Sequence, residues 1–360
     1  MSRALPVVES RMAVYGDLPA RPVGWGGEAL PGLEDTQGRQ VTYLRLSVTD
    51  RCDLGCVYCM PPGGEIEHTV RRELLSFEEA TRLVGVLRAM GVRRVRLTGG
   101  EPLVRKDVVR LVEQMHASAP ELELAMTTNA TRLADLAAPL WNAGLRGINV
   151  SLDTLQSARF KAMTRGGDLG RVLAGIHAAR ELGFRIKINI VAVRGHNDDE
   201  VGELVDWAWA LGFVPRFIEL MPLGEGAHLG LRARMGADEV AARLGDRLGG
   251  DAPKDDAVRG PATYRQAADG SGRRVGFITP LSHEFCGSCN RLRVTARGDV
   301  RACLASRQAV SLRDVMRAST EDRDVAWAAW WALSGKEEGH RFLDPSELEH
   351  ENVGMSLIGG

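Results

Sequence analysis

Apolar runs alternate with amphipathic segments along most of the chain, and this rhythm predicts strands and helices in turn. The apolar runs predict six strands, at residues 41–49, 93–98, 122–128, 147–153, 185–193 and 214–221. Segments of helical period follow them, at residues 75–91, 104–118, 132–144, 155–164, 169–183 and 198–212. The first helix opens on a capping box, because Ser76 is followed three residues later by Glu79, and it stops at Gly91.

Strands that alternate with helices predict an α/β fold with a parallel sheet and right-handed crossovers. Periodicity alone does not separate a curved, incomplete barrel from a flat doubly wound sheet. Six units are fewer than the eight of a closed TIM barrel, and we predict an incomplete (β/α)6 TIM-type barrel. In either arrangement, ligands gather at the carboxyl ends of the strands.

Both ends of the chain depart from this rhythm. Residues 1–36 are rich in Pro and Gly and predict a flexible leader, which places the barrel at residues 37–230. Residues 231–360 predict a smaller C-terminal domain. It contains helices at 235–249, 311–318 and 321–333, a strand at 273–279, and a hairpin at 289–304 that turns at Arg297-Gly298-Asp299.

Composition excludes several classes of protein. A net charge of −1 gives no electrostatic case for nucleic acid or an anionic membrane as the main partner. The chain has no apolar run long enough to span a membrane and no signal peptide, and we expect a cytoplasmic protein. Only five of the 46 basic residues are lysine. A single Arg is therefore weak evidence for a site, whereas Lys187, within an apolar strand, stands out.

Three cysteines lie directly after the first predicted strand. Cys52, Cys56 and Cys59 are spaced by four and three residues, with no fourth ligand nearby. Zinc sites and closed iron–sulfur clusters normally take four protein ligands, so a four-iron cluster held here would keep one iron open to a small molecule. The alternatives are a structural zinc knuckle and three unrelated thiols.

A second triplet, Cys286, Cys289 and Cys303, accompanies the predicted hairpin. The hairpin would bring Cys303 back towards the other two, which again gives three thiols without an obvious fourth ligand. His283 lies three residues before Cys286 and could close a zinc site. Two triplets in a chain of this size indicate metal binding rather than a disulfide framework.

The first triplet, CxxxCxxC with Tyr58 before its last cysteine, resembles the signature of radical S-adenosylmethionine enzymes. Residues Thr98-Gly99-Gly100-Glu101-Pro102, one βα unit later, resemble the GGE motif of that superfamily. The resemblance implies a [4Fe–4S] cluster that cleaves S-adenosylmethionine to a 5′-deoxyadenosyl radical. Glycine at a strand end also lets backbone approach a ligand closely.

From Tyr43 to Gly360 the chain resembles the GTP 3′,8-cyclase family of molybdenum-cofactor biosynthesis. The motifs that carry the resemblance are LRLSVTDRC, CVYCMP, RLTGGEPLVRKD, TTNA, VSLDTL, FIELMP, GPATY, FCGSCNRLRVTA and the final IGG. Ala130 stands where the family commonly has Gly. The resemblance implies two [4Fe–4S] clusters, held by Cys52, Cys56 and Cys59 and by Cys286, Cys289 and Cys303. GTP is the implied substrate, and the open iron of the second cluster would bind its guanine.

The resemblance also implies the ligand contacts. Tyr58, Gly100, Ser151 and Met221 match S-adenosylmethionine contacts. Contacts to GTP are matched by Arg45, Arg96, Thr127, Lys187, Arg291, Leu292 and Arg293. Arg291, Arg293, Gly359 and Gly360 match residues that act in catalysis. The implied partners are an electron donor and the next enzyme of the pathway, cyclic pyranopterin monophosphate synthase, and a homodimer is a further expectation.

Two other hypotheses would also explain the cysteine triplets. A peptide-modifying radical enzyme with an auxiliary cluster would explain both triplets, but a peptide does not require converging positive charge. A non-catalytic zinc or iron–sulfur protein is the other rival. About eight irons per chain would fit two clusters, whereas one or two zinc ions without sulfide would favour the binding protein.

Removal of Gly359 and Gly360 is expected to abolish cyclisation while both clusters are retained. A tail without side chains can pass between ligands where any Cβ would clash. Iron content and product formation, measured on the truncated chain, test this. A truncated chain with full activity would contradict it.

Overall fold

The computed structural model describes residues 12–13, 18–63, 68–253, 260–306, 308–340, 342 and 355. Its centre is a curved parallel sheet of six strands in sequence order. The strands are β2 (Tyr43–Ser47), β3 (Arg94–Thr98), β4 (Glu123–Thr128), β5 (Gly147–Ser151), β6 (Arg185–Val191) and β7 (Val214–Ile218). All six predicted strands are thereby confirmed.

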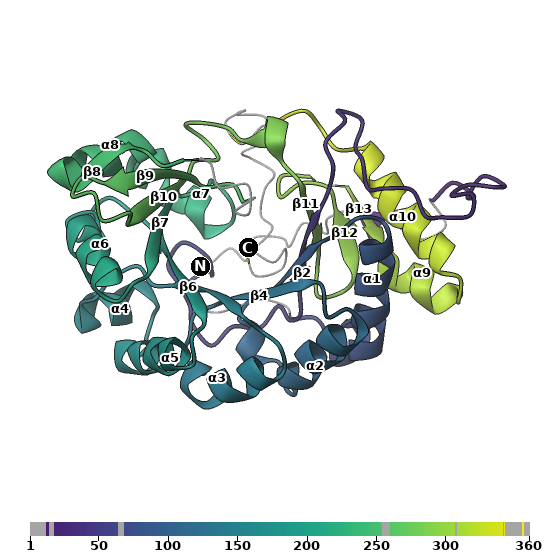
Figure 1. Ribbon diagram of the computed structural model, residues 1–360, viewed down its shortest axis with the longest axis horizontal. Helices are drawn as coiled ribbons and strands as arrows, with labels where there is room; N and C mark the ends of the chain where they lie inside the picture. Colours follow the sequence, from purple (N-terminus) through teal and green to yellow (C-terminus); the bar gives the residue numbers. More distant parts are fainter. Residues whose placement is uncertain are drawn as a thin grey trace, which may run out of the picture.

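Helices cover the outer face of this sheet and form an arc around it (Figure 1). They are α1 (Phe77–Ala89), α2 (Val108–Ser118), α3 (Leu133–Asn142), α4 (Ser157–Met163), α5 (Leu169–Glu181) and α6 (Val201–Ala210). The predicted capping box is confirmed, because Ser76 Oγ accepts from the amide of Glu79 and the Glu79 carboxylate accepts from the amide of Ser76. The fold is the predicted α/β incomplete barrel.

The C-terminal region extends both edges of the barrel sheet. At one edge β10 (Arg274–Ile278) pairs in parallel with β7, followed by β9 (Thr263–Ala267) and β8 (Leu248–Asp251). At the other edge β11 (Arg291–Val294) pairs in parallel with β2, followed by β12 (Asp299–Arg301), β13 (Ala309–Ser311) and β1 (Met12–Ala13). The described strands form one sheet in which β8 and β1 are the edges, so the barrel stays open.

The remaining helices lie around these C-terminal strands. They are α7 (Glu225–Leu229), α8 (Ala237–Leu244), α9 (Leu312–Ala318) and α10 (Asp322–Ser334). The predicted hairpin is confirmed as β11 and β12, which pair antiparallel across the expected turn. Strands β8, β9 and β13 are short, and the sequence pattern did not indicate them. No helix among the described residues is long and apolar enough to cross a membrane.

The strands have two different faces because successive side chains alternate across a sheet. The outward residues are apolar, such as Leu44, Leu46, Val95 and Leu97, and are fully buried under the helices. The inward residues are polar or charged, such as Arg45, Arg96 and Lys187, and line a cavity. Stability therefore comes from the layer between sheet and helices, while the barrel interior is left for a polar ligand.

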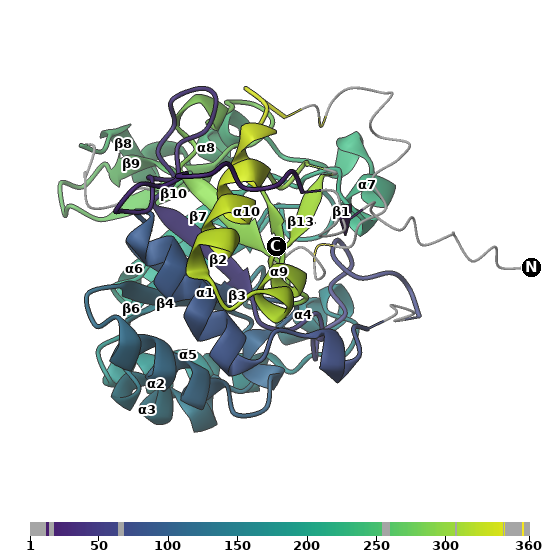
Figure 2. The same cartoon turned by 90° about the vertical axis from the view of Figure 1, so that its right-hand side faces the viewer.

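Residues 18–36, within the segment expected to be a flexible leader, pack against α10, as Figure 2 shows for the purple ribbon beside that helix. Trp327 donates its indole N–H to the carbonyl of Pro19, and the Trp25 ring lies 5.2 Å from the Trp327 ring. Leu33 is only 1% exposed. These contacts depend on aromatic residues close to the other end of the chain, which a local sequence pattern cannot reveal.

A buried charged group joins this segment to the second cysteine triplet. Arg39 donates to the Asp35 carboxylate at 2.7 Å and to the carbonyls of Cys286, Glu337 and Glu338 at 2.7–3.0 Å. Lys336 Nζ lies 3.8 Å from Asp35 and donates to the carbonyls of Cys289 and Arg291. Side-chain charges near the N-terminus thus hold the backbone on which two cysteines sit.

Replacement of Arg39 by Met is expected to lower the free energy of unfolding by about 3–5 kcal/mol. The change breaks a buried ion pair and leaves three backbone carbonyls without their hydrogen-bond donor. Arg88→Met, which removes an exposed ion pair with Glu121, is the matched control and should cost less than about 1 kcal/mol. Denaturant unfolding measures both, and equal losses would contradict the assignment.

Candidate active site

One cavity of about 340 Å³ lies inside the open barrel and is lined by both cysteine triplets. The first triplet follows the carboxyl end of β2. The second triplet reaches the same space from the loop before β11, which carries Cys286 and Cys289, and from the end of β12, which Cys303 follows. Of the residues expected from the sequence to form the site, those that line the cavity are Arg45, Cys52, Cys56, Tyr58, Cys59, Arg96, Gly100, Thr127, Ser151, Lys187, Met221, Cys286, Cys289, Arg291, Arg293 and Cys303.

Among the described residues, one that was expected in the site, Leu292, is not in that wall. The side chain of Leu292 faces away from the cavity and is fully buried in the apolar core, as the alternation along β11 requires. Gly359 and Gly360 lie outside the residues that the structure describes.

The first cysteine loop is closed by its own backbone. The amides of Cys59 and Met60 donate to the Cys56 carbonyl at 2.9 and 3.0 Å. Gly55 and Val57 donate to carbonyls at the end of α4, which ties the loop to the barrel. Burial raises the pKa of Cys52 to about 12 and that of Cys56 well above its ordinary value. Thiolates buried side by side require a cationic group, and an iron–sulfur cluster fits this donor set.

The Gly-Gly pair after β3 allows the backbone to pass directly against the start of this loop. A Cβ on Gly100 would lie 2.4 Å from the carbonyl oxygen of Arg51, and one on Gly99 would lie 2.4 Å from that of Thr49. Glu101 follows, and its buried carboxylate accepts from the Thr128 hydroxyl and from the amides of Asn129 and Leu103. Burial raises the pKa of Glu101 to about 7 despite these bonds.

Tyr58 is held by a carboxylate from the barrel. Its hydroxyl donates to Asp153 Oδ2 at 2.5 Å, and Asp153 Oδ1 accepts from the amide of Val191 at 2.8 Å. Burial raises the pKa of Asp153 to about 6. The aromatic side chain between two cysteines is therefore fixed to β5 and β6 rather than left on a free loop.

The second triplet has a different electrostatic setting. Burial raises the pKa of Cys286. Burial also acts to raise the pKa of Cys289, but the positive charges of Arg291 and Lys336 outweigh it and lower that pKa to about 7. A thiolate at Cys289 therefore forms more readily than at an ordinary cysteine. Three cysteines in this environment also fit an iron–sulfur cluster.

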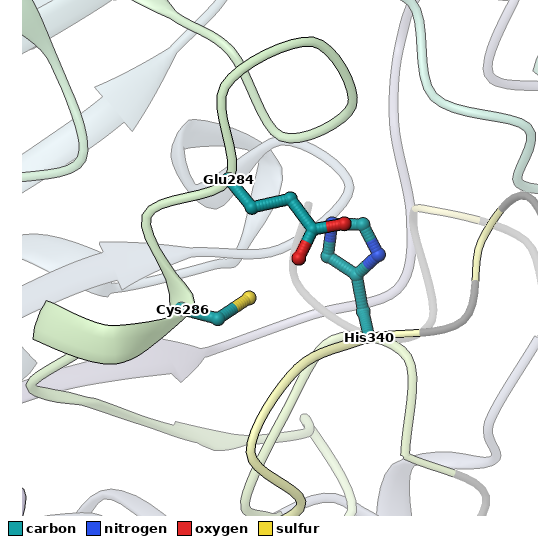
Figure 3. A group of neighbouring side chains, drawn as sticks. All are labelled: Glu284, Cys286 and His340. Atoms are coloured by element: carbon teal, nitrogen blue, oxygen red, sulfur yellow. The ribbon is translucent and has the colours of Figure 1, made fainter.

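The histidine beside this triplet is His340, not His283. The His283 side chain is 63% exposed and lies 3.6 Å from Asp238. His340, which the sequence pattern left without a role, lies in the cavity wall with Cys286, and Glu284 lies beside both of them (Figure 3). No local signal indicated it, because it follows α10 and is far from Cys286 in the sequence.

Basic side chains crowd the inner face of the barrel. Arg293, Arg45 and Arg96 occupy the same level of the neighbouring strands β11, β2 and β3. Burial and then the charge of Arg293 hold the pKa of Arg45 well below its usual range. Burial and then Arg291 lower the pKa of Arg293 to about 10. Such a group is stabilised by an anionic ligand.

Lys187 faces this row across the cavity. Burial, followed by the charges of Arg216 and Arg96, lowers its pKa to about 7. Among the described residues, Thr127 Oγ1 and Arg216 Nε are buried without a hydrogen-bond partner. Buried polar atoms are rarely left unsatisfied in a resting protein, and these two are available to a ligand.

Comparison with known proteins agrees with this geometry. The Radical SAM superfamily model matches residues 46–208, and the Molybdenum Cofactor Synthesis C model matches residues 214–342. The chain is 43% identical over 342 residues to the GTP 3′,8-cyclase of Rhodopseudomonas palustris strain TIE-1, with 91% of this chain and 96% of that protein covered. It is 44% identical over 330 residues to GTP 3′,8-cyclase 1 of Pseudomonas aeruginosa, with 91% and 98% covered.

The chain belongs to the GTP 3′,8-cyclase family.

Solved structures of low identity share the fold. Streptococcus suis SuiB bound to its precursor peptide SuiA matches with a TM-score of 0.58 and 15% identity, over 82% of this chain and 67% of that one. SuiB bound to S-adenosylmethionine matches with a TM-score of 0.55 and 16% identity, over 74% and 60%. At this identity the likeness concerns the fold alone.

Several cavity residues of this cyclase-family chain were not predicted from the sequence. They are Tyr43, Arg94, Asn149, Asp153, Asn189, Arg216 and Glu219, and all line the cavity. Most occupy alternate positions of strands that the sequence did predict. Side chains alternate between the two faces of a strand, so the polar residues at every second position of those strands could have been predicted to face the cavity.

Gly100→Ala is expected to lower the free energy of unfolding by about 1–3 kcal/mol, because the added Cβ forces the backbone of Arg51 away. The displaced loop should also bind iron less well at the first triplet. Gly85→Ala in α1, where no atom lies within 4 Å of the added Cβ, is the control and should be neutral or slightly stabilising. Unfolding and iron analysis measure both, and equal behaviour would contradict the steric argument.

Proposed function

We propose that this chain catalyses the reaction for which its relatives are named, the 3′,8-cyclisation of GTP to (8S)-3′,8-cyclo-7,8-dihydroguanosine 5′-triphosphate, as the first step of molybdenum-cofactor biosynthesis. The observation that carries the proposal is one cavity lined by two cysteine triplets and by a row of arginines between them. Family membership at 43–44% identity over 91% of the chain supports it.

Cys52, Cys56 and Cys59 would hold one [4Fe–4S] cluster, and Cys286, Cys289 and Cys303 the other. The clusters would supply radical chemistry. One electron would cleave S-adenosylmethionine to methionine and a 5′-deoxyadenosyl radical, which would take the hydrogen of the ribose 3′ carbon and leave as 5′-deoxyadenosine. The ribose radical would add to guanine carbon 8, and a second electron from the reductant with one proton would complete the dihydro product. The protein's own residues exclude water, orient the two substrates and neutralise the phosphates.

Tyr58, Gly100, Ser151 and Met221 would bind S-adenosylmethionine near the first triplet. Two features support this assignment. The Tyr58 ring is fixed by Asp153, and at Gly100 a bare backbone is needed for close packing against the cysteine loop.

The basic row would bind GTP. Arg45, Arg96 and Lys187 converge from β2, β3 and β6, and guanidinium groups suit phosphate oxygens because they donate in a bidentate fork. Thr127 Oγ1 supplies a further donor. The remaining assignments are Arg291 and Arg293 beside the second triplet, Leu292 through its backbone, and Gly359 and Gly360 as a tail that completes the site.

Further proposals concern organisation and partners. We propose that the chain divides into a leader at 1–36, the barrel at 37–230 and a C-terminal domain at 231–360. A reductant supplies electrons, and cyclic pyranopterin monophosphate synthase accepts the product. We also propose a homodimer in the cytoplasm.

Anaerobic incubation of the reconstituted chain with GTP, S-adenosylmethionine and a strong reductant tests the function. The expected products are 5′-deoxyadenosine and the cyclic dihydroguanosine triphosphate. If 5′-deoxyadenosine forms without any cyclic product from GTP, the substrate assignment is refuted while the radical chemistry stands.

Binding of GTP at pH 8 is expected to take up about one proton, because a triphosphate beside Lys187 raises a pKa that stands at about 7 without ligand. At pH 8 the free amine is mostly neutral and is charged on binding. At pH 6 it is already charged, so this uptake disappears. Calorimetry in buffers of different ionisation enthalpy measures it.

Lys187→Met should abolish the uptake and weaken GTP binding about tenfold or more. The exposed Lys161→Met serves as the control and should change neither. Unchanged proton uptake in the Lys187 variant would contradict the position of the phosphates.

A further inference from the structure

We propose that Glu284, Cys286 and His340 form a mononuclear site for a divalent transition-metal ion of the Zn²⁺ type, and that this ion and the second cluster exclude each other. The site shares only Cys286 with the second triplet. The exclusion rests on the proposed function, since it requires a cluster at that triplet, whereas the binding of the ion does not.

The three side chains converge on one point from two segments of the chain (Figure 3). One ligand atom from each lies within 4.8 Å of the other two. Ligand atoms around a tetrahedral zinc ion, bound at about 2.0–2.3 Å, lie about 3.3–3.8 Å apart. Small side-chain rotations are therefore sufficient to close the three donors around an ion.

The donor set selects the class of metal. A carboxylate, a thiolate and an imidazole together suit Zn²⁺ and similar transition metals, whereas Mg²⁺ and Ca²⁺ prefer oxygen donors alone. The two anionic donors balance the charge of a divalent ion. Three protein ligands leave a fourth position for water, as in sites that exchange their ligands.

His340 would exchange hydrogen bonds of its ring for the ion. Its side chain is 6% exposed, and its Nε2 lies 3.9 Å from Glu284 Oε1. Nε2 hydrogen-bonds the Pro280 carbonyl, and Nδ1 accepts from the Phe342 amide. An ion on Nε2 would replace the first bond and also end the second, because Nδ1 would then carry the ring proton; an ion on Nδ1 would replace only the second. The Glu284 side chain is 47% exposed, which gives an ion access from solvent.

The backbone of the shared cysteine is held in place. Arg39 donates to the Cys286 carbonyl at 3.0 Å, and Arg39 also holds the Glu337 and Glu338 carbonyls just before His340. One buried guanidinium thus fixes both segments that supply the ligands. The geometry of the three donors is consequently a property of the folded chain rather than of a free surface loop.

Exclusion follows from the count of thiolates. The second cluster would take Cys286, Cys289 and Cys303, and each cysteine offers one sulfur. An ion that holds Cys286 with His340 and Glu284 leaves only two thiolates, which are too few for the cluster. The site would act on assembly: zinc captured before iron and sulfide arrive would block the second cluster and spare the first.

A competing reading is that zinc binds the three thiolates and ignores His340 and Glu284. A full-length chain in which Cys286 is the only cysteine separates the two readings, with Cys52, Cys56, Cys59, Cys289 and Cys303 replaced by Ser. Co²⁺ is the probe, because its visible spectrum reports tetrahedral geometry and its charge-transfer band reports thiolate ligation. We expect one Co²⁺ per chain, with the thiolate band, and displacement by Zn²⁺.

In that background His340→Gln and Glu284→Gln should each weaken Co²⁺ binding at least about tenfold. His283→Gln is the matched control, because that histidine is close in sequence but exposed and outside the group, and it should have no effect. Absence of the thiolate band, or equal affinity in the His340 and His283 variants, would overturn the site.

The exclusion has its own measurement in the chain with all six cysteines. Reconstitution with iron and sulfide should give about eight irons per chain, and prior addition of one equivalent of Zn²⁺ should lower this to about four. In the His340→Gln chain the same zinc should leave iron near eight. Equal iron loss in both chains would overturn the exclusion. Failure of the proposed function would appear differently, as eight irons without cyclic product.

Discussion

Buried positive charge inside the barrel is the constraint on which the rest of the structure depends. Within the part of the chain that the structure describes, seven Arg and Lys side chains line the cavity, against three acidic ones; the basic residues are Arg45, Arg94, Arg96, Lys187, Arg216, Arg291 and Arg293, and the acidic residues are Glu101, Asp153 and Glu219. Like charges out of water repel each other and lower each other's pKa. The apolar layer between sheet and helices must supply the stability that the interior does not.

Residues at the carboxyl ends of the strands hold the two cysteine loops in place. Most of these contacts involve backbone groups of the loops and turns. Gly99 and Gly100 let the backbone after β3 pack directly against the start of the first cysteine loop. The Glu101 carboxylate accepts hydrogen bonds from the turn after β4. Across the cavity, Glu219 at the end of β7 accepts from the amides of Leu281 and Ser282, just before the second triplet.

The turn after β4 illustrates how strongly this geometry is imposed. Ala130 adopts a φ of 62°, a left-handed conformation that an L-residue reaches only at a cost of roughly 1–2 kcal/mol. Its hydrogen bonds to Thr128 and Leu133 outweigh the steric penalty.

Local chemistry in the sequence determined the six strands, the capping box at Ser76, the hairpin after Cys289 and both triplets, because each depends on residues close together in the chain. Arg45, Arg96 and Lys187 could also be placed on their strands, since alternation is a property of the strand itself. Only the tertiary structure decided that β10 and β11 extend opposite edges of one sheet and bring the triplets to one cavity. It likewise decided the roles of Arg39 and His340, because their partners are long-range, and long-range contacts leave no periodic signal in a single sequence.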